Sequence, residues 1–310
     1  MESATASQIL DDHVFLVGRP PLDEYLGFVT AQTADADAVD IGVLASDWRA
    51  ANDHVRELER VEQGCADAPS IGPVGKNLSA LVEQVHSDPL FQRSFGIVPT
   101  DIGVVELDKV VVYQKFINLA YVRQIQQKLG PNPTEEAVFR LCLPFDHPQP
   151  TVNFGRIANN AYMFMSPSTD LRFLEPVLLQ FDRIIGHRPQ GPVAGVIALL
   201  VGFGSNFLNL IHVDNRLVMN NGSHRAYALR DMGITHVPCA IQRVSRREEL
   251  RVVGSSDLQN NPDNYLKNAR PPLLRDYFDP ALQKIFKVPR RVRQVKIAFG
   301  VEQLDVPASS

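Results

Sequence analysis

The stretch 217-LVMNNGSHRAYALRDMGITHVPCAI-241 joins two short apolar runs through a segment that opens Asn-Asn-Gly-Ser-His-Arg and closes Met-Gly. Gly222 tolerates the positive φ of a tight turn, and Ser223 is a favourable residue at a helix start. Gly233 is a typical residue just beyond a helix end. The stretch therefore predicts a strand, a short helix that ends at Met232, and a second strand.

The first turn of this helix carries two side chains that can be cationic, His224 and Arg225. A helix N-terminus has unsatisfied N–H groups and partial positive charge, so it favours anions and disfavours cations. These two residues therefore predict a bound phosphate or carboxylate that offsets the misplaced charge. The alternative is an ordinary strand–helix connection, in which both side chains cover the helix end or pair with acidic residues elsewhere.

Residues 217–243 resemble the signature of the ParB/sulfiredoxin-like superfamily: a strand, Gly-x-His-Arg, a short helix, a Gly, and a strand containing Val-Pro. A weaker resemblance extends back to about residue 160, where 170-DLRFLEP-176 is similar to the segment that opens the fold in the free-serine-kinase branch. The resemblance implies an α/β domain with a small mixed sheet that binds nucleotide phosphates. It implies Glu175 as the catalytic base, a catalytic part for His224, and a phosphate cradle formed by Gly222, Ser223, His224 and Arg225.

Two departures narrow the choice of branch. Sulfiredoxins carry a nucleophilic Cys where this chain has Ser223, so sulfinic-acid repair is not expected. Chromosome-partitioning members continue with a helix-turn-helix, and no such pair of helices is evident after residue 250. The kinase-like branch is therefore the nearest in pattern.

The segments around this signature alternate between strand and helix patterns. Upstream, 161–165 predicts a strand, 173–186 an amphipathic helix, and 193–201 a buried strand or short helix. The apolar runs of 207–219 flank Asp214-Asn215, which is a β-hairpin signal. Downstream, we expect a helix near 281–287 and a last strand near 293–299.

The first half of the chain has mainly helical patterns. Apolar spacings of three and four predict helices at 46–64 and 78–85, and a wide apolar arc predicts a third at 108–130. Asn132 is expected to cap a fourth helix. We therefore expect an α+β fold with a helical domain at 1–150, a ParB/sulfiredoxin-like domain at 160–250, and a basic extension at 251–310 that packs on the core.

Three further polar residues have local interpretations. Gln114 and Asn118 lie four residues apart in an apolar segment, where they either line a pocket or hydrogen-bond within the core. His147, between Asp146 and Pro148, is interpreted as a solvated loop residue.

Charge and cysteine content exclude several classes of protein. The net charge of −4 argues against a surface that grips nucleic acid throughout. The acidic residues 1–66 (13 Asp/Glu against 4 Lys/Arg) are expected to pair with the basic residues 243–296 (13 Lys/Arg against 6 Asp/Glu), although that basic surface could instead meet a phosphate-bearing ligand. Three widely spaced cysteines encode neither a disulfide framework nor a structural zinc. The absence of a signal peptide and of a long apolar run predicts a cytoplasmic protein without a membrane partner.

The preferred hypothesis is a nucleotide-dependent enzyme that transfers a phosphoryl group to a small molecule, using ATP or another nucleotide with Mg²⁺. Glu175 would deprotonate the acceptor, while the helix start stabilises the transferred group. One alternative is a regulator that binds nucleotide or nucleic acid without catalysis, through 243–251 and 290–296. Nucleic acid is the less expected partner, because the N-terminal half is acidic. Another alternative is a ParB-like scaffold with a haem or flavin. The sequence does not indicate an oligomeric state or protein ligands for a metal.

Overall fold

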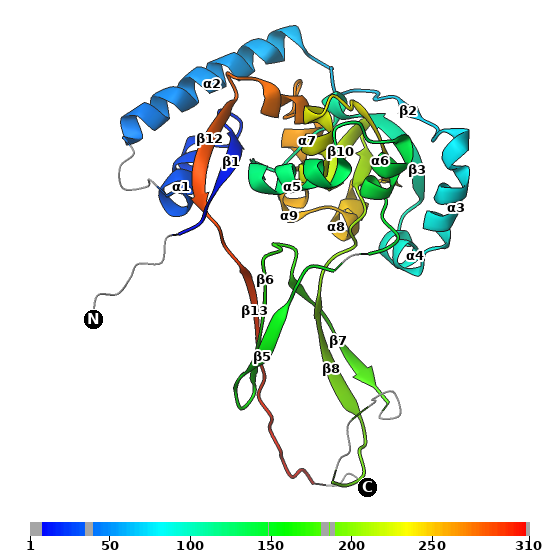
Figure 1. The fold of residues 1–310 in the computed structure, drawn as a ribbon. Coiled ribbons are helices and arrows are strands. Elements are labelled where there is room, and N and C mark those ends of the chain that lie inside the picture. Colours follow the sequence, from blue (N-terminus) through cyan, green and yellow to red (C-terminus); the bar gives the residue numbers. More distant parts are fainter. Residues whose placement is uncertain (1–7, 35–39, 148, 181–185, 187–189, 308–310) are drawn as a thin grey trace. The chain divides into compact units, whose positions relative to one another are not determined.

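The computed structural model describes residues 8–34, 40–147, 149–180, 186 and 190–307. The described chain is mixed α+β with several small sheets, in agreement with the expected fold class at this level. It packs as two compact units (Figure 1). Unit 1 spans Met1–His147 and Ser205–Arg290, and unit 2 spans Pro148–Gly204 and Arg291–Ser310. The segment 160–250, expected as one domain, is thus divided between the two units.

The centre of unit 1 is a mixed sheet with strand order β10-β9-β11-β3-β2. Its strands are β2 (Ile71–Gly72), β3 (Thr100–Glu106), β9 (Asn209–Val213), β10 (Arg216–Asn221) and β11 (His236–Arg243). Strands β9 and β11 are parallel, and the other pairs are antiparallel. The expected hairpin is confirmed: Asp214 and Asn215 join β9 to β10 with φ of 46° and 63°, the positive values that a tight two-residue hairpin turn requires.

Helices cover this sheet and bury its apolar side chains. They are α3 (Ser79–Ser87), α4 (Pro89–Phe95), α5 (Leu119–Leu129), α6 (Glu135–Cys142) and α7 (Ser223–Asp231), with the short α8 (Leu250–Val253), α9 (Ser256–Asn260) and α10 (Pro262–Leu266) nearby. The core combines residues of both halves of the sequence, such as Phe91, Phe139, Leu210 and Ile241. The chain therefore needs residues 71–143 and 205–290 together to complete one core.

A second sheet of unit 1 joins the N-terminal and C-terminal parts of the sequence. Its order is β12-β1-β4, with β1 at Leu10–Leu16, β4 at Phe116–Asn118 and β12 at Gln283–Pro289. Helices α1 (Leu22–Gln32) and α2 (Ile41–Val61) pack beside it in Figure 1, around a cluster of aromatic rings from Phe15, Tyr25, Phe28 and Phe286.

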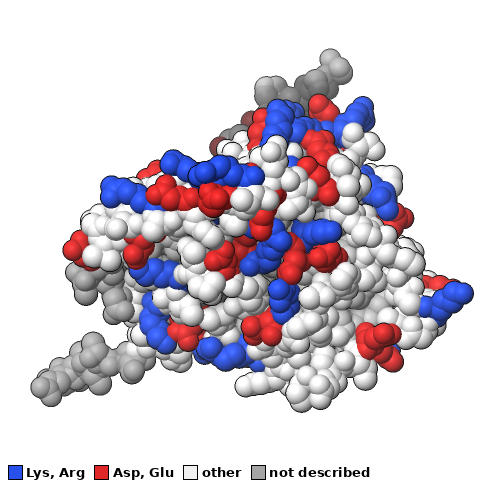
Figure 2. All heavy atoms as spheres, turned by 90° about the horizontal axis from the view of Figure 1, so that it is seen from above, with Lys and Arg blue, Asp and Glu red and all other residues white. Residues whose placement is uncertain are grey.

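The expected pairing between the acidic N-terminal part and the basic C-terminal part is confirmed along β1 and β12. Arg290 binds Asp11 at 2.6 Å and Lys287 binds Asp12 at 2.5 Å. Figure 2 shows the consequence for the surface, since Lys and Arg are interspersed with Asp and Glu over the face that it presents.

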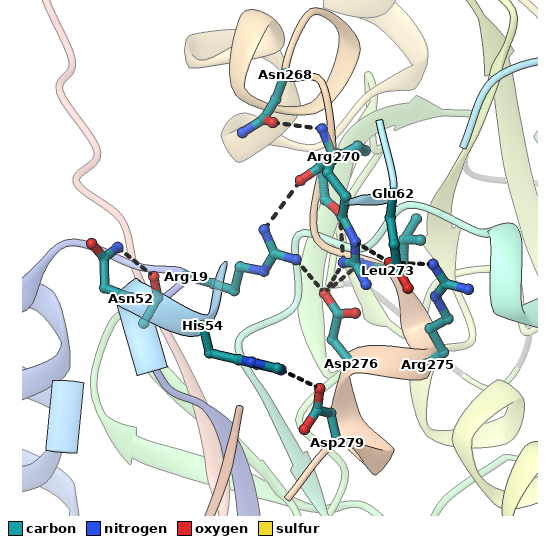
Figure 3. Close-up of polar contacts among 12 residues, drawn as sticks. Arg19, Asn52, His54, Glu62, Asn268, Arg270, Leu273, Arg275, Asp276 and Asp279 are labelled. Atoms are coloured by element: carbon teal, nitrogen blue, oxygen red, sulfur yellow. Dashed lines mark hydrogen bonds and ion pairs between the residues drawn. The ribbon is translucent and has the colours of Figure 1, made fainter. Parts of the chain in front are cut away.

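A buried ion-pair network fastens the end of β1 and helix α2 to residues 268–279 (Figure 3). Asp276 is 1% exposed and accepts from Arg19 at 2.8 Å and from Arg270 at 2.6 Å. Arg270 also donates to Glu62 at 3.0 Å, and Glu62 accepts from Arg275. Because such charges are costly to bury without partners, the loss of any one of them would be unfavourable, and the network stabilises the packing of the second sheet against the rest of unit 1.

The described residues of unit 2 form two antiparallel sheets. One has the order β13-β6-β5, with β5 at Asn153–Ala158, β6 at Ala161–Ser166 and β13 at Arg293–Ala298. The other pairs β7 (Arg172–Leu179) with β8 (Val196–Gly202). The strands expected near 161–165 and 293–299 are therefore confirmed. The segment 193–201, expected as a buried strand or short helix, forms strand β8, but this strand is partly exposed rather than buried.

Four expectations about helices are wrong. The third helix is confined to Leu119–Leu129, because Val110 to Val112 form an extended segment whose Val111 bridges to Val218 and Leu273.

The helix expected at 173–186 is strand β7 as far as Leu179, and residues 181–185 lie outside the described residues. The helix expected at 281–287 is strand β12, which pairs with β1. Thr134, not Asn132, caps α6, because its side chain accepts from the N–H of Ala137.

Candidate functional site

Helix α7 starts where strand β10 ends, as the sequence predicts. Gly222 precedes the helix with φ of +106°, and a Cβ at this position would lie 3.0 Å from Cγ of Leu208. Glycine is therefore required both by the backbone conformation and by the space. The N-cap residue Gly222 has no side chain that could cap the helix, and the first N–H groups of a helix have no intrahelical acceptor.

Arg225 is turned into the protein, where it binds backbone carbonyls. It is 5% exposed, and its Nη1 donates to the carbonyls of Asn206 at 2.7 Å, Leu141 at 3.1 Å and Cys142 at 3.4 Å. Leu141 and Cys142 end helix α6, where unsatisfied carbonyls and the helix dipole favour a cation. The charge of Arg225 is therefore compensated within the fold, without the bound anion that its sequence position suggests.

His224 is held as a neutral imidazole. Burial, together with the nearby charges of His13 and Arg225, lowers the pKa of His224 to about 4. The backbone N–H of Asn118 donates to its Nε2 at 3.0 Å, so Nε2 acts as an acceptor and the neutral ring carries its proton on Nδ1. This arrangement argues against His224 as a cationic phosphate ligand near pH 7.

A segment of the N-terminal half runs beside the start of α7. The N–H of Val111 donates to the carbonyl of Leu217 at 2.9 Å, and the hydroxyl of Tyr113 donates to the carbonyl of Asn220 at 2.8 Å. Five residues beyond Tyr113 comes the contact between Asn118 and His224. The start of this segment therefore pairs in parallel with β10, where Val111 bridges to Val218, and its end reaches the first turn of α7 at His224.

Lys115 lies between these contacts in the sequence, and its own carbonyl accepts from the N–H of Leu16 on β1. Its side chain is 33% exposed, and its ammonium group binds the carboxylates of Glu24 on α1 and, at 3.9 Å, Asp257 on α9. The sequence-based assignment missed Lys115 because residues 108–130 were expected to be helical. The signal that could have found it is the cation three residues after the buried apolar run 110–112.

The other residues singled out in the sequence lie elsewhere. Glu175 is on the exposed strand β7 of unit 2, opposite Leu200, whereas the four cradle residues are in unit 1. Gln114 donates to the carbonyl of Phe116, and Asn118 caps α5, so both hydrogen-bond within the fold, the second of the two expected roles.

His147 is not a solvated loop residue. Its Nε2 lies 2.6 Å from Asp88 and its ring packs against Phe207.

No family model matches the chain, and neither the curated proteins nor the solved structures contain a match. Across the described residues, no group of three or more His, Cys, Asp or Glu side chains is arranged to hold a metal ion. None of the described helices has both the length and the apolar character needed to cross a bilayer.

Proposed function

We propose that unit 1 binds the phosphate groups of a nucleotide at the start of α7, and that the protein transfers a phosphoryl group to a small molecule. The observation that supports this most is the start of α7 after Gly222, a residue without a capping side chain, together with the cation Lys115 in the segment that contacts this helix start through Asn118. Backbone N–H groups at a helix start bind phosphate oxygens, and Gly222 lets a ligand approach the backbone closely. The resemblance of residues 217–243 to the ParB/sulfiredoxin-like signature supports the same ligand.

The cation in this proposal is Lys115 in place of Arg225. The side chain of Lys115 is partly exposed and held by two carboxylates, whereas Arg225 is committed to carbonyls of the core. A phosphate would compete with Glu24 and Asp257 for the ammonium group. The two carboxylates would then be available to a nucleotide-bound Mg²⁺, which proteins hold with one or two carboxylates and the substrate phosphates.

The base that deprotonates the acceptor is a separate question. Glu175 is supported by the resemblance alone, because it lies in unit 2 on an exposed strand. Glu24 and Asp257 are carboxylates of unit 1 that lie beside Lys115. We therefore place the base among these three residues, with the unit 1 pair preferred on geometry.

Calorimetric titration of ATP, ADP and CTP with Mg²⁺ tests the proposal. The native protein should bind at least one of them, and Lys115→Gln should weaken binding roughly 10- to 100-fold, the effect of losing one charge-assisted hydrogen bond. Lys109→Gln is a matched control, since Lys109 is also a partly exposed lysine paired with a carboxylate, and it should bind like the native protein. A folded native protein that binds none of the three nucleotides would overturn the proposal.

A further inference from the structure

The β13-β6-β5 sheet of unit 2 differs in charge from the chain as a whole. Residues 149–169 and 291–301, which form this sheet and its connections, contain Arg156, Arg291, Arg293 and Lys296 but no Asp or Glu. The whole protein has a net charge of −4. The sheet is therefore a local basic surface on an acidic protein, and its preferred partner is an anion.

The strand register places aromatic and basic side chains on one face of this sheet. Phe154 lies opposite Phe164 on β6, and Arg156 lies opposite Tyr162 two residues further. Since side chains alternate along a strand, these four share a face. On the other neighbour of β6, Arg293 lies opposite Ser166 and falls on the same face.

The aromatic rings on this face form two pairs. Phe154 and Phe164 stack with centroids 5.7 Å apart, and Tyr162 stacks on Phe299 at 6.5 Å. Three of the four rings are well exposed: Phe154 at 75%, Phe299 at 43% and Tyr162 at 38%. The two pairs are separated by two residues of β6, roughly 7 Å.

We infer that this face binds single-stranded nucleic acid. Exposed rings on a sheet are platforms on which successive bases stack, and nearby arginines contact the phosphates. The aromatic pairs would stack with the bases, and the strands without Asp or Glu would contact the phosphate backbone of the nucleic acid. A duplex does not fit this surface, because its bases are already stacked on one another and do not expose their faces to the protein rings.

The net charge of the chain argued against a nucleic-acid partner because it sums the acidic N-terminal part with this basic sheet. The surface proposed here is local and lies in unit 2, away in sequence from the α7 start of unit 1. This surface therefore shares no residue with the proposed nucleotide site.

Fluorescence anisotropy with a labelled oligo-dT of about 12 nucleotides tests the inference on the full-length protein. The native protein should bind with a Kd of roughly 1–100 µM at physiological salt, the range of non-specific binding. Phe154→Ala should weaken binding at least about fivefold through lost stacking. Phe173→Ala, an exposed phenylalanine on β7, is the matched control and should bind like the native protein.

The salt dependence tests the phosphate contacts separately. Between about 50 and about 200 mM salt, Arg293→Gln should reduce the slope of log K against log salt by about 0.7, the value for one contact to a single strand. Arg93→Gln, an exposed arginine of unit 1, should leave the slope unchanged, and so should Ser223→Asp at the nucleotide site.

Three results would overturn the inference: no binding by the native protein below about 100 µM, equal losses in Phe154→Ala and Phe173→Ala, or equally tight binding of a duplex of the same length. A native protein that self-associates through this face, with Phe154→Ala restoring the monomer and no effect on oligo-dT, would also overturn it.

Discussion

Replacing Arg225 with methionine tests whether this residue is part of the fold or a ligand of phosphate. The variant keeps the length of the side chain and removes a charged donor that binds three backbone carbonyls at 2.7–3.4 Å. Hydrogen bonds to charged groups contribute about 1.5–3 kcal/mol, and buried carbonyls left without a donor add a desolvation cost. The carbonyl of Cys142 keeps a second donor, the N–H of Leu208, so the loss falls mainly on Leu141 and Asn206.

We therefore expect Arg225→Met to lower the free energy of unfolding of unit 1 by about 3–5 kcal/mol. Trp48 is the sole tryptophan of the chain and belongs to unit 1, where its indole N–H donates to the carbonyl of Pro20. Its fluorescence during urea unfolding reports on this unit separately from unit 2, which avoids treating the whole chain as one two-state transition. The matched control is Arg93→Met at an exposed position, which should change the free energy by less than about 0.5 kcal/mol.

The reasoning is refuted if Arg225→Met unfolds within about 0.5 kcal/mol of the native protein, and more directly if it also loses nucleotide binding while fully folded. In that case the guanidinium would be a ligand group, as its sequence position suggests. If the expected destabilisation is found, loss of nucleotide binding in an Arg225 variant carries no information about contact with the ligand, because the helix start itself is disturbed.

Three other predictions concern the same unit and use the same fluorescence assay. Asp276→Ala should cost about 3–5 kcal/mol, because it leaves the buried Arg19 without a carboxylate and removes one of the two that Arg270 binds, whereas the exposed Asp53→Ala should be nearly neutral. His224 has a pKa of about 4 in the folded protein, lowered mainly by burial, so the unfolded chain binds more protons below pH 6.5. The contribution of neutral His224 to the free energy of unfolding, about 3 kcal/mol, is fully present above pH 6.5 and is lost as the pH falls towards 4. A native protein whose stability is flat from pH 7 to 5, or changes with pH in the same way as that of His224→Gln, would contradict this prediction. His236→Gln is the control at an exposed histidine. Gly222→Ala should cost about 1–3 kcal/mol through strain at φ +106° and a close Cβ contact, and unaltered stability would show that the turn relaxes.

Features with strong local signals could be predicted from the sequence. Gly222 and Gly233 bound helix α7 because each takes a positive φ that other residues avoid. The turn residues Asp214 and Asn215 fix the β9–β10 hairpin in the same way. These elements depend on neighbouring residues, so a window of 25 residues contains their determinants.

Features that depend on distant partners could not be predicted. Apolar runs alone do not distinguish a strand from a helix, and 281–287 forms strand β12 only because it pairs with β1, some 270 residues earlier. The prediction of a helix over residues 108–118 was wrong for a similar reason, since Val111 bridges to Val218, which is distant in the sequence.

The candidate site shows the same limit. The positions of His224 and Arg225 in the first turn were correctly expected, but their meaning depends on acceptors and donors from Asn118, Leu141 and Asn206. Those partners come from other segments, and no local spacing reveals them. Lys115 entered the site only when the contacts of residues 111 and 118 with β10 and α7 were known.

The measurement that tests the nucleotide site most directly is Mg²⁺–nucleotide titration of Ser223→Asp. A carboxylate in the first turn of α7 interacts favourably with the helix dipole and should stabilise unit 1 by roughly 0.3–1 kcal/mol. The same carboxylate occupies the position proposed for the phosphate and repels a phosphate electrostatically. Ser79→Asp makes the same change at the first residue of α3 and should leave nucleotide binding unaltered. The account predicts that Ser223→Asp is at least as stable as the native protein and binds no nucleotide. Undiminished nucleotide binding by this variant would contradict a phosphate site at the start of α7.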